Sequence, residues 1–250
     1  MARRRGLAEA GGGLFGGATE ATLDASEAPA GHLGHRARLR RRFLAGGAEA
    51  VADYELLELL LFAIPRLDTK PLAKALIARF GSFANVLAAP PEALRAVPGV
   101  GDAVVVALKV AQAAALKLAA AEVRDAPVLN AWDKLIAYLH AALAREPVEQ
   151  VRVLYLDAKN RLKADEVHGR GTVNHTPLYP REIVRRALEL QATALILVHN
   201  HPSGDPTPSR PDIELTREIR EAAALFGIAL HDHVIVGNGR VASFRQLGLL

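Results

Sequence analysis

The sequence predicts an α/β domain with a mixed sheet, preceded by a small all-α domain. From residue 35 to 121, Ala and Leu dominate and apolar residues recur at helical spacing without a strand pattern. After Pro147, apolar runs of strand length alternate with helical segments and hairpin turns, and this mixture is typical of a mixed sheet covered by helices. We therefore expect a disordered tail over 1–34, a helical domain over 35–121, a linker over 122–130 and an α/β domain over 131–250.

The composition is that of a globular protein. Half of the 250 residues are hydrophobic and 23% are charged, which provides enough apolar material for a core. The absence of Cys excludes disulfides, thiol nucleophiles and Cys-containing zinc sites, and it suits the reducing cytoplasm, where we place the protein. No apolar run approaches the ~20 residues of a membrane span, so no contact with a membrane is expected. The Arg-rich N-terminus lacks the apolar stretch of a secretory signal.

Residues that begin or end helices recur along the first part of the chain. The pattern becomes helical at His35, and proline and glycine mark where later helices begin or end. We expect an apolar helix that starts at Asp53 and is closed by Pro65, a helix over 71–80 capped by Gly81, a short helix that starts at Ser82, and a long helix over 102–121.

A Gly-containing turn, Gly99-Val100-Gly101, leads into the long helix. Unpaired backbone N–H groups and the helix dipole make such a helix start suitable for phosphate. The stretch resembles the helix-hairpin-helix motif, which binds the DNA backbone without reading bases. A dinucleotide fingerprint is excluded, because no strand precedes the turn and its third Gly is missing. The alternative is an ordinary helical hairpin that serves only packing.

Five arginines crowd into one short stretch, although the net charge is only +4. Like charges so close together repel one another unless an anion neutralises them, and phosphate backbones are the usual partner. A solvated helix start or a basic arm explains the cluster equally well. The cluster consists of Arg36, Arg38, Arg40, Arg41 and Arg42.

The second part of the chain mixes strands and helices. Asn130 is a suitable N-cap for a helix over 131–144, and turn residues at 157–160 join the first two strands into a hairpin. We expect strands over 151–156, 161–168, 193–199, 228–236 and 240–244, and helices over 180–190 and 209–226.

Two histidines end the strand over 193–199. His199 and His201 point to the same face, because side chains alternate with a period of two along a strand. A Gly- and Pro-rich loop lets the chain fold back, so that Asp212 in the first turn of the next helix can meet both imidazoles. Two His and one carboxylate leave one tetrahedral position for water, as in catalytic zinc sites. Helix capping by Ser209 and Asp212 is a competing explanation for those two residues, and it is compatible with ligation.

The segment His199-Asn200-His201-Pro202, followed by Ser209 and Asp212, resembles the JAMM (MPN-type) metallopeptidase motif. The longer string through the Gly-Asp-Pro loop resembles the RadC family, and the likeness runs from about His35 to Leu250. The resemblance implies a JAMM/MPN-like, cytidine-deaminase-like layered fold. It also implies that His199, His201 and Asp212 bind Zn²⁺ and that Ser209 orients or stabilises the oxyanion.

JAMM enzymes also use an upstream Glu, at the start of a strand, as the general base for the zinc-bound water. Glu149, two residues before the predicted strand at Val151, matches this position. The rivals are Glu146, Glu166 and Glu182. We expect Glu166 to face outward from its strand, and Glu182 lies in the first turn of a helix, where the dipole alone explains a carboxylate.

The other histidines lack a ligand spacing. His231 and His233 form a second His-x-His without a suitably placed acid, which favours a supporting or a packing role. For Asp205, in Gly-Asp-Pro, we expect a role in the turn rather than at the metal.

These observations favour a zinc-dependent peptidase or isopeptidase that acts on a protein or peptide. The alternative is a DNA-binding scaffold associated with repair or recombination and without peptidase activity, in which residues 35–121 bind DNA non-specifically. Both can hold together. A nucleobase deaminase needs Cys ligands in its usual signature, and a phosphodiester site usually gathers more carboxylates or two metals. The substrate and the oligomeric state stay open.

Overall fold

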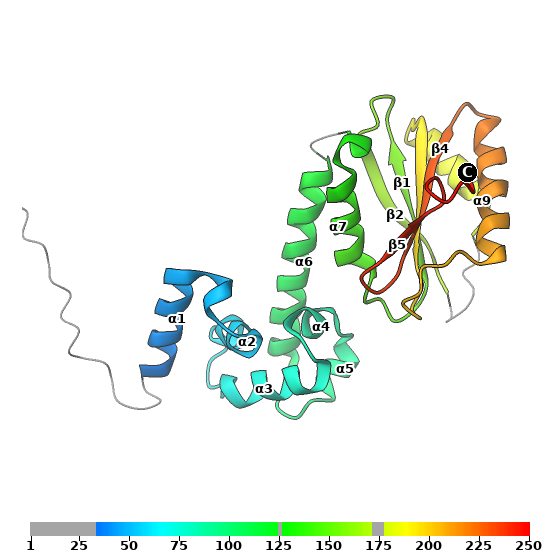
Figure 1. The fold of residues 1–250 in the computed structure, drawn as a ribbon. Helices are drawn as coiled ribbons and strands as arrows, with labels where there is room; N and C mark the ends of the chain where they lie inside the picture. The colour runs from blue at the N-terminus through cyan, green and yellow to red at the C-terminus, as the bar shows by residue number, and fades with distance from the viewer. Residues whose placement is uncertain (1–33, 125–126, 172–177) are drawn as a thin grey trace, which may run out of the picture.

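The structure, a computed structural model, describes residues 34–124, 127–171 and 178–250. The predicted tail therefore lies outside the described residues, except for Gly34. Figure 1 shows a group of short helices, one long helix that leads away from them, and a sheet flanked by helices. This mixed α/β architecture agrees with the predicted fold class.

The helical part has its own hydrophobic core, to which Leu57, Leu76, Leu94 and Leu108 contribute fully buried side chains. The predicted boundary signals act as expected: Gly81 has a φ of 88°, and the Ser82 hydroxyl accepts the N–H of Asn85. A short helix after Pro90 was not predicted. The elements are α1 (His35–Gly46), η2 (Ala48–Ala50), α2 (Asp53–Leu61), α3 (Thr69–Phe80), α4 (Phe83–Ala88) and α5 (Pro91–Arg95).

Within the described residues, the sheet has five strands in the order β2-β1-β3-β4-β5. Only β3 and β4 pair in parallel, and α9 (Arg210–Ala224) connects them, whereas the other neighbours are antiparallel. The sheet is therefore mixed, as predicted. The strands are β1 (Gln150–Leu156), β2 (Leu162–Arg170), β3 (Ala194–Asn200), β4 (Ala229–Val236) and β5 (Val241–Ser243).

Helices cover both faces of the sheet, which makes β3 a fully buried strand. Ile196 and Val198 pack on the side of α7 (Trp132–Leu143), together with Leu139. Leu195 and Leu197 pack on the opposite side, with residues of α8 (Pro180–Glu189) and α9. Side chains two residues apart on a strand point to the same face. His199, two residues after Leu197, therefore also faces α8 and α9.

The long helix α6 (Asp102–Arg124) joins the two parts (Figure 1). Its first turns pack into the helical core, whereas Val123 is fully buried in the cluster on the α7 side of the sheet. Val128, which the sequence also places in the linker, is buried in the same cluster. The predicted linker therefore contains packed residues. The domain boundaries themselves stay a prediction.

Two details of this region differ from the prediction. Asn130 is not the N-cap of α7, because residues Val128–Ala131 form a 3₁₀ turn and the helix begins only at Trp132. The expectation that no apolar segment has membrane-span length is wrong for α6, which is long and apolar enough by length and composition. Its two lysines interrupt the apolar run without making the segment polar. Helices inside soluble proteins pass the same test.

Candidate metal centre

The end of β3 carries the two histidines to the edge of the sheet. The side chain of His199 is 2% exposed and that of His201 is 18% exposed. The backbone N–H of His201 donates to the carbonyl of Val236 at 3.0 Å, so that β4 still holds the chain one residue beyond β3. Both imidazoles are thus fixed by the sheet, one inside the core and one at its rim.

The start of α9 brings in the carboxylate. Ser209 is the N-cap of the helix: its hydroxyl accepts the N–H of Asp212, and its own N–H donates to Asp212 Oδ2 at 2.7 Å. The Ser209 hydroxyl also donates to Asp212 Oδ2, at 2.6 Å. These contacts form the capping box that the sequence suggested, and they hold the Asp212 side chain toward the histidines.

The three side chains meet. Nε2 of His199 lies 3.0 Å from Nε2 of His201 and 3.4 Å from Asp212 Oδ1, and Nε2 of His201 lies 3.6 Å from Asp212 Oδ2. Tetrahedral zinc with bonds of ~2.0–2.1 Å requires donor atoms about 3.3 Å apart. Each imidazole nitrogen thus lies close to this spacing from the other and from one of the two carboxylate oxygens, and the described residues contain this one His-His-Asp group.

Hydrogen bonds also present the correct nitrogen of His201. Its Nδ1 lies 2.7 Å from the carbonyl oxygen of Asp205, which can only accept. Nδ1 therefore carries a proton, so Nε2 is the nitrogen that can offer a lone pair to a metal. The Asp205 carboxylate instead accepts from the N–H and hydroxyl of Thr207, in agreement with the predicted turn. The part played by its carbonyl was not predicted.

The charges of the site suit a cation at neutral pH. Burial lowers the pKa of His199 to about 4, so its imidazole is neutral. Burial alone would raise the pKa of Asp212, but the hydrogen bonds from His201 and Ser209 outweigh it and lower the pKa strongly. The contact with Asp212 raises the pKa of His201.

Glu149 lies beside this group. Val151 pairs with His199 across the antiparallel β1–β3 ladder, so the residue two positions before Val151 is level with His201. The charge of Glu149 contributes to the raised pKa of His201, and its backbone carbonyl accepts the N–H of Gly171. The structure therefore places Glu149 near the His201 end of the group.

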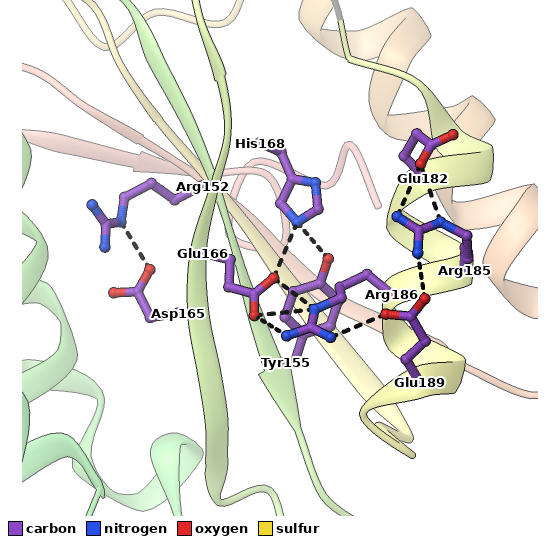
Figure 2. A network of polar contacts seen from close by, with 9 residues as sticks. All are labelled: Arg152, Tyr155, Asp165, Glu166, His168, Glu182, Arg185, Arg186 and Glu189. Carbon is purple, nitrogen blue, oxygen red and sulfur yellow. Dashed lines mark hydrogen bonds and ion pairs between the residues drawn. The ribbon is translucent and has the colours of Figure 1, made fainter.

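Two of the rival carboxylates are engaged elsewhere. Figure 2 shows Glu166 against the guanidinium of Arg186, which donates to it from Nε and Nη2 at 2.6 to 3.1 Å. Glu166 thus faces α8 rather than outward into solvent, and the bonds from Arg186 lower its pKa. Glu182 pairs with Arg181 and Arg185. Both line a cavity of about 480 Å³ between β2 and α8 rather than the His-His-Asp group.

The remaining rival, Glu146, lies in the turn before β1. Its backbone carbonyl accepts from the side chain of Asn200, and so does that of Val148. Asn200 is the residue between the two histidines, and its side chain is 1% exposed on the opposite face of β3. The sequence indicated that it faces away from the metal, but nothing in the sequence showed that it binds the segment that carries Glu149.

The second His-x-His divides into two environments. His231 contacts Asn160 Oδ1 at 2.7 Å, away from the candidate ligands. His233 is 1% exposed, and its Nε2 lies 2.8 Å from Nδ1 of His199. The sequence left a supporting role and a packing role open for this pair. In the structure His233 contacts the candidate ligand His199, whereas His231 contacts Asn160.

The residues predicted for DNA lie in the helical part. The turn Gly99-Val100-Gly101 joins α5 to α6, and Gly99 has a φ of 87°. In the Arg cluster, Arg36 donates to the carbonyl of Leu67, and both Arg36 and Arg40 lie over the ring of Phe62. Arg42 pairs with Glu55. Contacts within the chain thus account for much of a cluster that looked unneutralised in sequence.

Comparison with known proteins agrees with this geometry. A family model described as "RadC-like JAB domain" matches residues 129–249. A UPF0758 protein of Rhodobacter capsulatus is 62% identical over 213 residues, which cover 85% of this chain and all of the relative. The chain belongs to the RadC family. A second RadC relative, a UPF0758 protein of Ruegeria pomeroyi, is 56% identical over 217 residues, 86% of this chain and 97% of its own length.

The match to the RadC-like JAB domain includes every residue of the candidate centre, from Glu149 to Asp212. It begins after α6, so the helical part lies outside it. The alignments with the two relatives are longer than this match, and similarity to them therefore extends into the helical part.

Proposed function

We propose that this RadC-family protein is a JAMM-type metallohydrolase that cleaves a peptide or isopeptide bond in a protein or peptide. The observation that carries the proposal is the meeting of Nε2 of His199, Nε2 of His201 and the Asp212 carboxylate, with one ligand atom of each residue within 4.8 Å of the others. Three protein ligands leave one position open, as catalytic rather than structural zinc requires.

The chain supplies the remaining chemistry with its own residues. His199, His201 and Asp212 would hold Zn²⁺, which supplies a Lewis acid and a water whose pKa falls toward ~7. Glu149, on the His201 side, takes a proton from the attacking water and returns it to the leaving amine. Ser209 holds Asp212 through its backbone N–H, and we propose that its hydroxyl hydrogen turns from Asp212 Oδ2 to the oxyanion when substrate is bound.

Exposure supports a macromolecular substrate. His199 is buried, whereas His201 and Asp212 are partly exposed, so the open side of the centre faces the surface of the protein. A main chain lying across the sheet edge can reach that side without entering the core. The absence of Cys is compatible with activity in the cytoplasm.

Metal content tests the proposal. We expect about one zinc per chain in the wild type by mass spectrometry, and loss of the metal in His199→Ala/Asp212→Ala. His231→Ala is the matched control, because it removes a strand histidine that does not touch the three ligands. A wild type that stays metal-free after reconstitution would leave the motif as a helix cap and would exclude metal-dependent hydrolysis.

The alternative is a DNA-binding role for the helical part, with or without hydrolysis. It is supported by the Gly99-Val100-Gly101 turn at the start of α6 and by Arg41, which lies exposed on α1. We expect the full chain to bind duplex DNA with a steep salt dependence. Arg41→Glu should weaken this binding, and the absence of binding at low salt would exclude the role.

A further inference from the structure

A buried histidine and a threonine stand behind the first ligand. His233 on β4 lies with its Nε2 2.8 Å from Nδ1 of His199, and its ring stacks on Phe244 with the centroids 4.5 Å apart. On its other side, His233 Nδ1 lies 2.6 Å from the hydroxyl oxygen of Thr216. Thr216 is 2% exposed, so this chain of contacts is closed to solvent.

The direction of every hydrogen bond in this chain follows from its far end. The Thr216 hydroxyl oxygen lies 2.5 Å from the backbone carbonyl of Asp212. A carbonyl has no hydrogen to give, so the hydroxyl hydrogen must lie between these two oxygens. The hydroxyl can then only accept from His233, whose proton is therefore on Nδ1.

The same logic continues to the ligand. With its proton on Nδ1, neutral His233 offers a lone pair at Nε2, which accepts from Nδ1–H of His199. His199 must then keep the lone pair of its own Nε2, the atom that points at His201 and Asp212. His233 is 1% exposed, and a charge buried without a counterion is costly, which favours a neutral ring.

We propose that Thr216 and His233 are positioning residues that fix His199 in its Nδ1–H tautomer and so reserve Nε2 for the metal. The proposal rests on the proposed function for the identity of the metal. The tautomer itself is a property of the metal-free chain, so it can be tested without the metal.

The chain of bonds joins two ligands. It runs from the backbone of Asp212 through Thr216 and His233 to the ring of His199. Thr216 follows Asp212 by one helical turn, so the ligand and the start of the chain move together on α9. His199 and Asp212 are thus held in register before a cation arrives, and this lowers the cost of ordering them on binding.

His201 provides an internal comparison. Its Nδ1–H meets a backbone carbonyl, which can never donate, so its tautomer needs no further support. The partner of His199 is an imidazole, which can donate or accept at the same nitrogen. Without the Thr216 hydroxyl, His233 is able to carry its proton on Nε2 and donate to His199 Nδ1. His199 would then be protonated on Nε2 and blocked toward the metal.

Two substitutions of Thr216 isolate the hydroxyl. Thr216→Val keeps the shape of the side chain and removes the hydroxyl, whereas Thr216→Ser keeps the hydroxyl and is the matched control. In long-range ¹H–¹⁵N NMR spectra of the metal-free full chain, we expect His199 to show the Nδ1–H tautomer in the wild type and in Thr216→Ser. We expect a mixture of tautomers in Thr216→Val.

Zinc affinity, measured by competition with a chromophoric chelator, should fall about 10- to 100-fold in Thr216→Val and stay near the wild type in Thr216→Ser. His233→Phe keeps the ring stacked on Phe244 and should show the same loss, which guards against a folding defect in one variant. Circular dichroism identifies the variants that fold.

An Nε2–H tautomer of His199 in the wild type would overturn the proposal. So would a folded Thr216→Val or His233→Phe that binds zinc as tightly as the wild type. A wild type that shows the Nδ1–H tautomer but binds no zinc would refute the proposed function and leave the positioning role supported.

Discussion

Asn200 Oδ1 accepts a hydrogen bond from the backbone N–H of Gln150 at 2.9 Å, deep between β3 and β1. The Nδ2 group of the same side chain donates to the carbonyls of Glu146 and Val148. One amide therefore holds the segment on both sides of Glu149. The His-Asn-His sequence thus serves both faces of β3, with two candidate ligands on one face and an anchor for the proposed base on the other.

Replacement of Asn200 should loosen that segment without emptying the metal centre. Asn200→Ala removes one buried and two part-buried hydrogen bonds to the backbone, and we expect a loss of about 2–4 kcal/mol in the free energy of unfolding. Zinc content should stay close to that of the wild type, because the side chain points away from the ligands. Urea denaturation and metal analysis of the same samples check both parts.

Asn200→Asp sharpens this prediction. The carboxylate keeps an acceptor for Gln150 but turns a second oxygen toward two carbonyls, so it should destabilise the protein more than alanine does at neutral pH. Equal stability of the aspartate variant and the wild type would contradict the assigned hydrogen bonds.

The general base can be tested by comparing two carboxylates. Glu149→Gln should retain zinc and reduce turnover of a cleavable peptide about 10²- to 10⁴-fold, because the amide cannot accept the proton of water. Glu166→Gln is the control. It weakens the contact with Arg186 and should cost about 1 kcal/mol of stability at most. A comparable loss of turnover in both variants would speak against Glu149 as the base.

The loop that orients His201 depends on a glycine in the last hairpin. A Cβ on Gly237 would lie 2.4 Å from the carbonyl oxygen of Gly204, a contact that no side chain tolerates. Gly237→Ala should therefore displace the loop and pull the Asp205 carbonyl away from His201 Nδ1. We expect weaker zinc binding, measured by chelator competition.

Gly239 is the matched control for that substitution. It has a φ of 74°, and a Cβ there would meet nothing within 4 Å. Gly239→Ala should cost about 1 kcal/mol through backbone strain alone and leave the affinity for zinc unchanged. A parallel loss of affinity in both variants would attribute the effect to the turn rather than to the loop.

Tyr138 predicts a pH dependence at alkaline pH. Burial, followed by the charge of Asp165 and the hydrogen bond that Tyr138 donates to it, raises the pKa of Tyr138 to about 12. The unfolded chain ionises near pH 10, so the stabilising effect is complete below pH 10 and is lost as the pH rises to 12. Tyr138→Phe should reduce this slope in denaturation curves, whereas Tyr179→Phe, at an exposed position, should not.

The sequence predicts most of the α/β domain because its boundaries are set locally. Pro180, Ser209 and the turn at 237–239 act within a few residues of themselves, and the structure places α8, α9 and the final hairpin there. The approach of His199, His201 and Asp212 is equally local, since it needs only the strand period and one return loop. As metal ligands, they stay a prediction.

The contact of His233 with His199 depends on the register between two strands that are far apart in the sequence. The sequence alone therefore did not predict it. His233 reaches His199 because β4 pairs in parallel with β3, with Leu197 opposite His233 and an irregularity after Leu195. No local pattern distinguishes His233 from His231. The one signal in the sequence for a supporting contact was Thr216, a polar residue one helical turn after Asp212.

Tertiary packing also explains why the predicted linker contains buried residues. Residues 122–130 are mostly polar or small in sequence, which suggested an exposed connection. Val123 and Val128 are nevertheless fully buried against α7 and the sheet. Two valines in a polar stretch are too weak a pattern to indicate burial, because their partners lie elsewhere in the chain.

The course of α6 also determines where the chain can be cut. A recombinant fragment that starts at residue 131 lacks Val123 and Val128, which are buried in the same cluster as Leu135 and Leu139. Ala119 and Ala120 pack against the same cluster. A fragment meant to carry the candidate metal centre should therefore begin within α6, before Ala119. The complementary fragment that ends at 121 would present a severed apolar helix and is expected to aggregate.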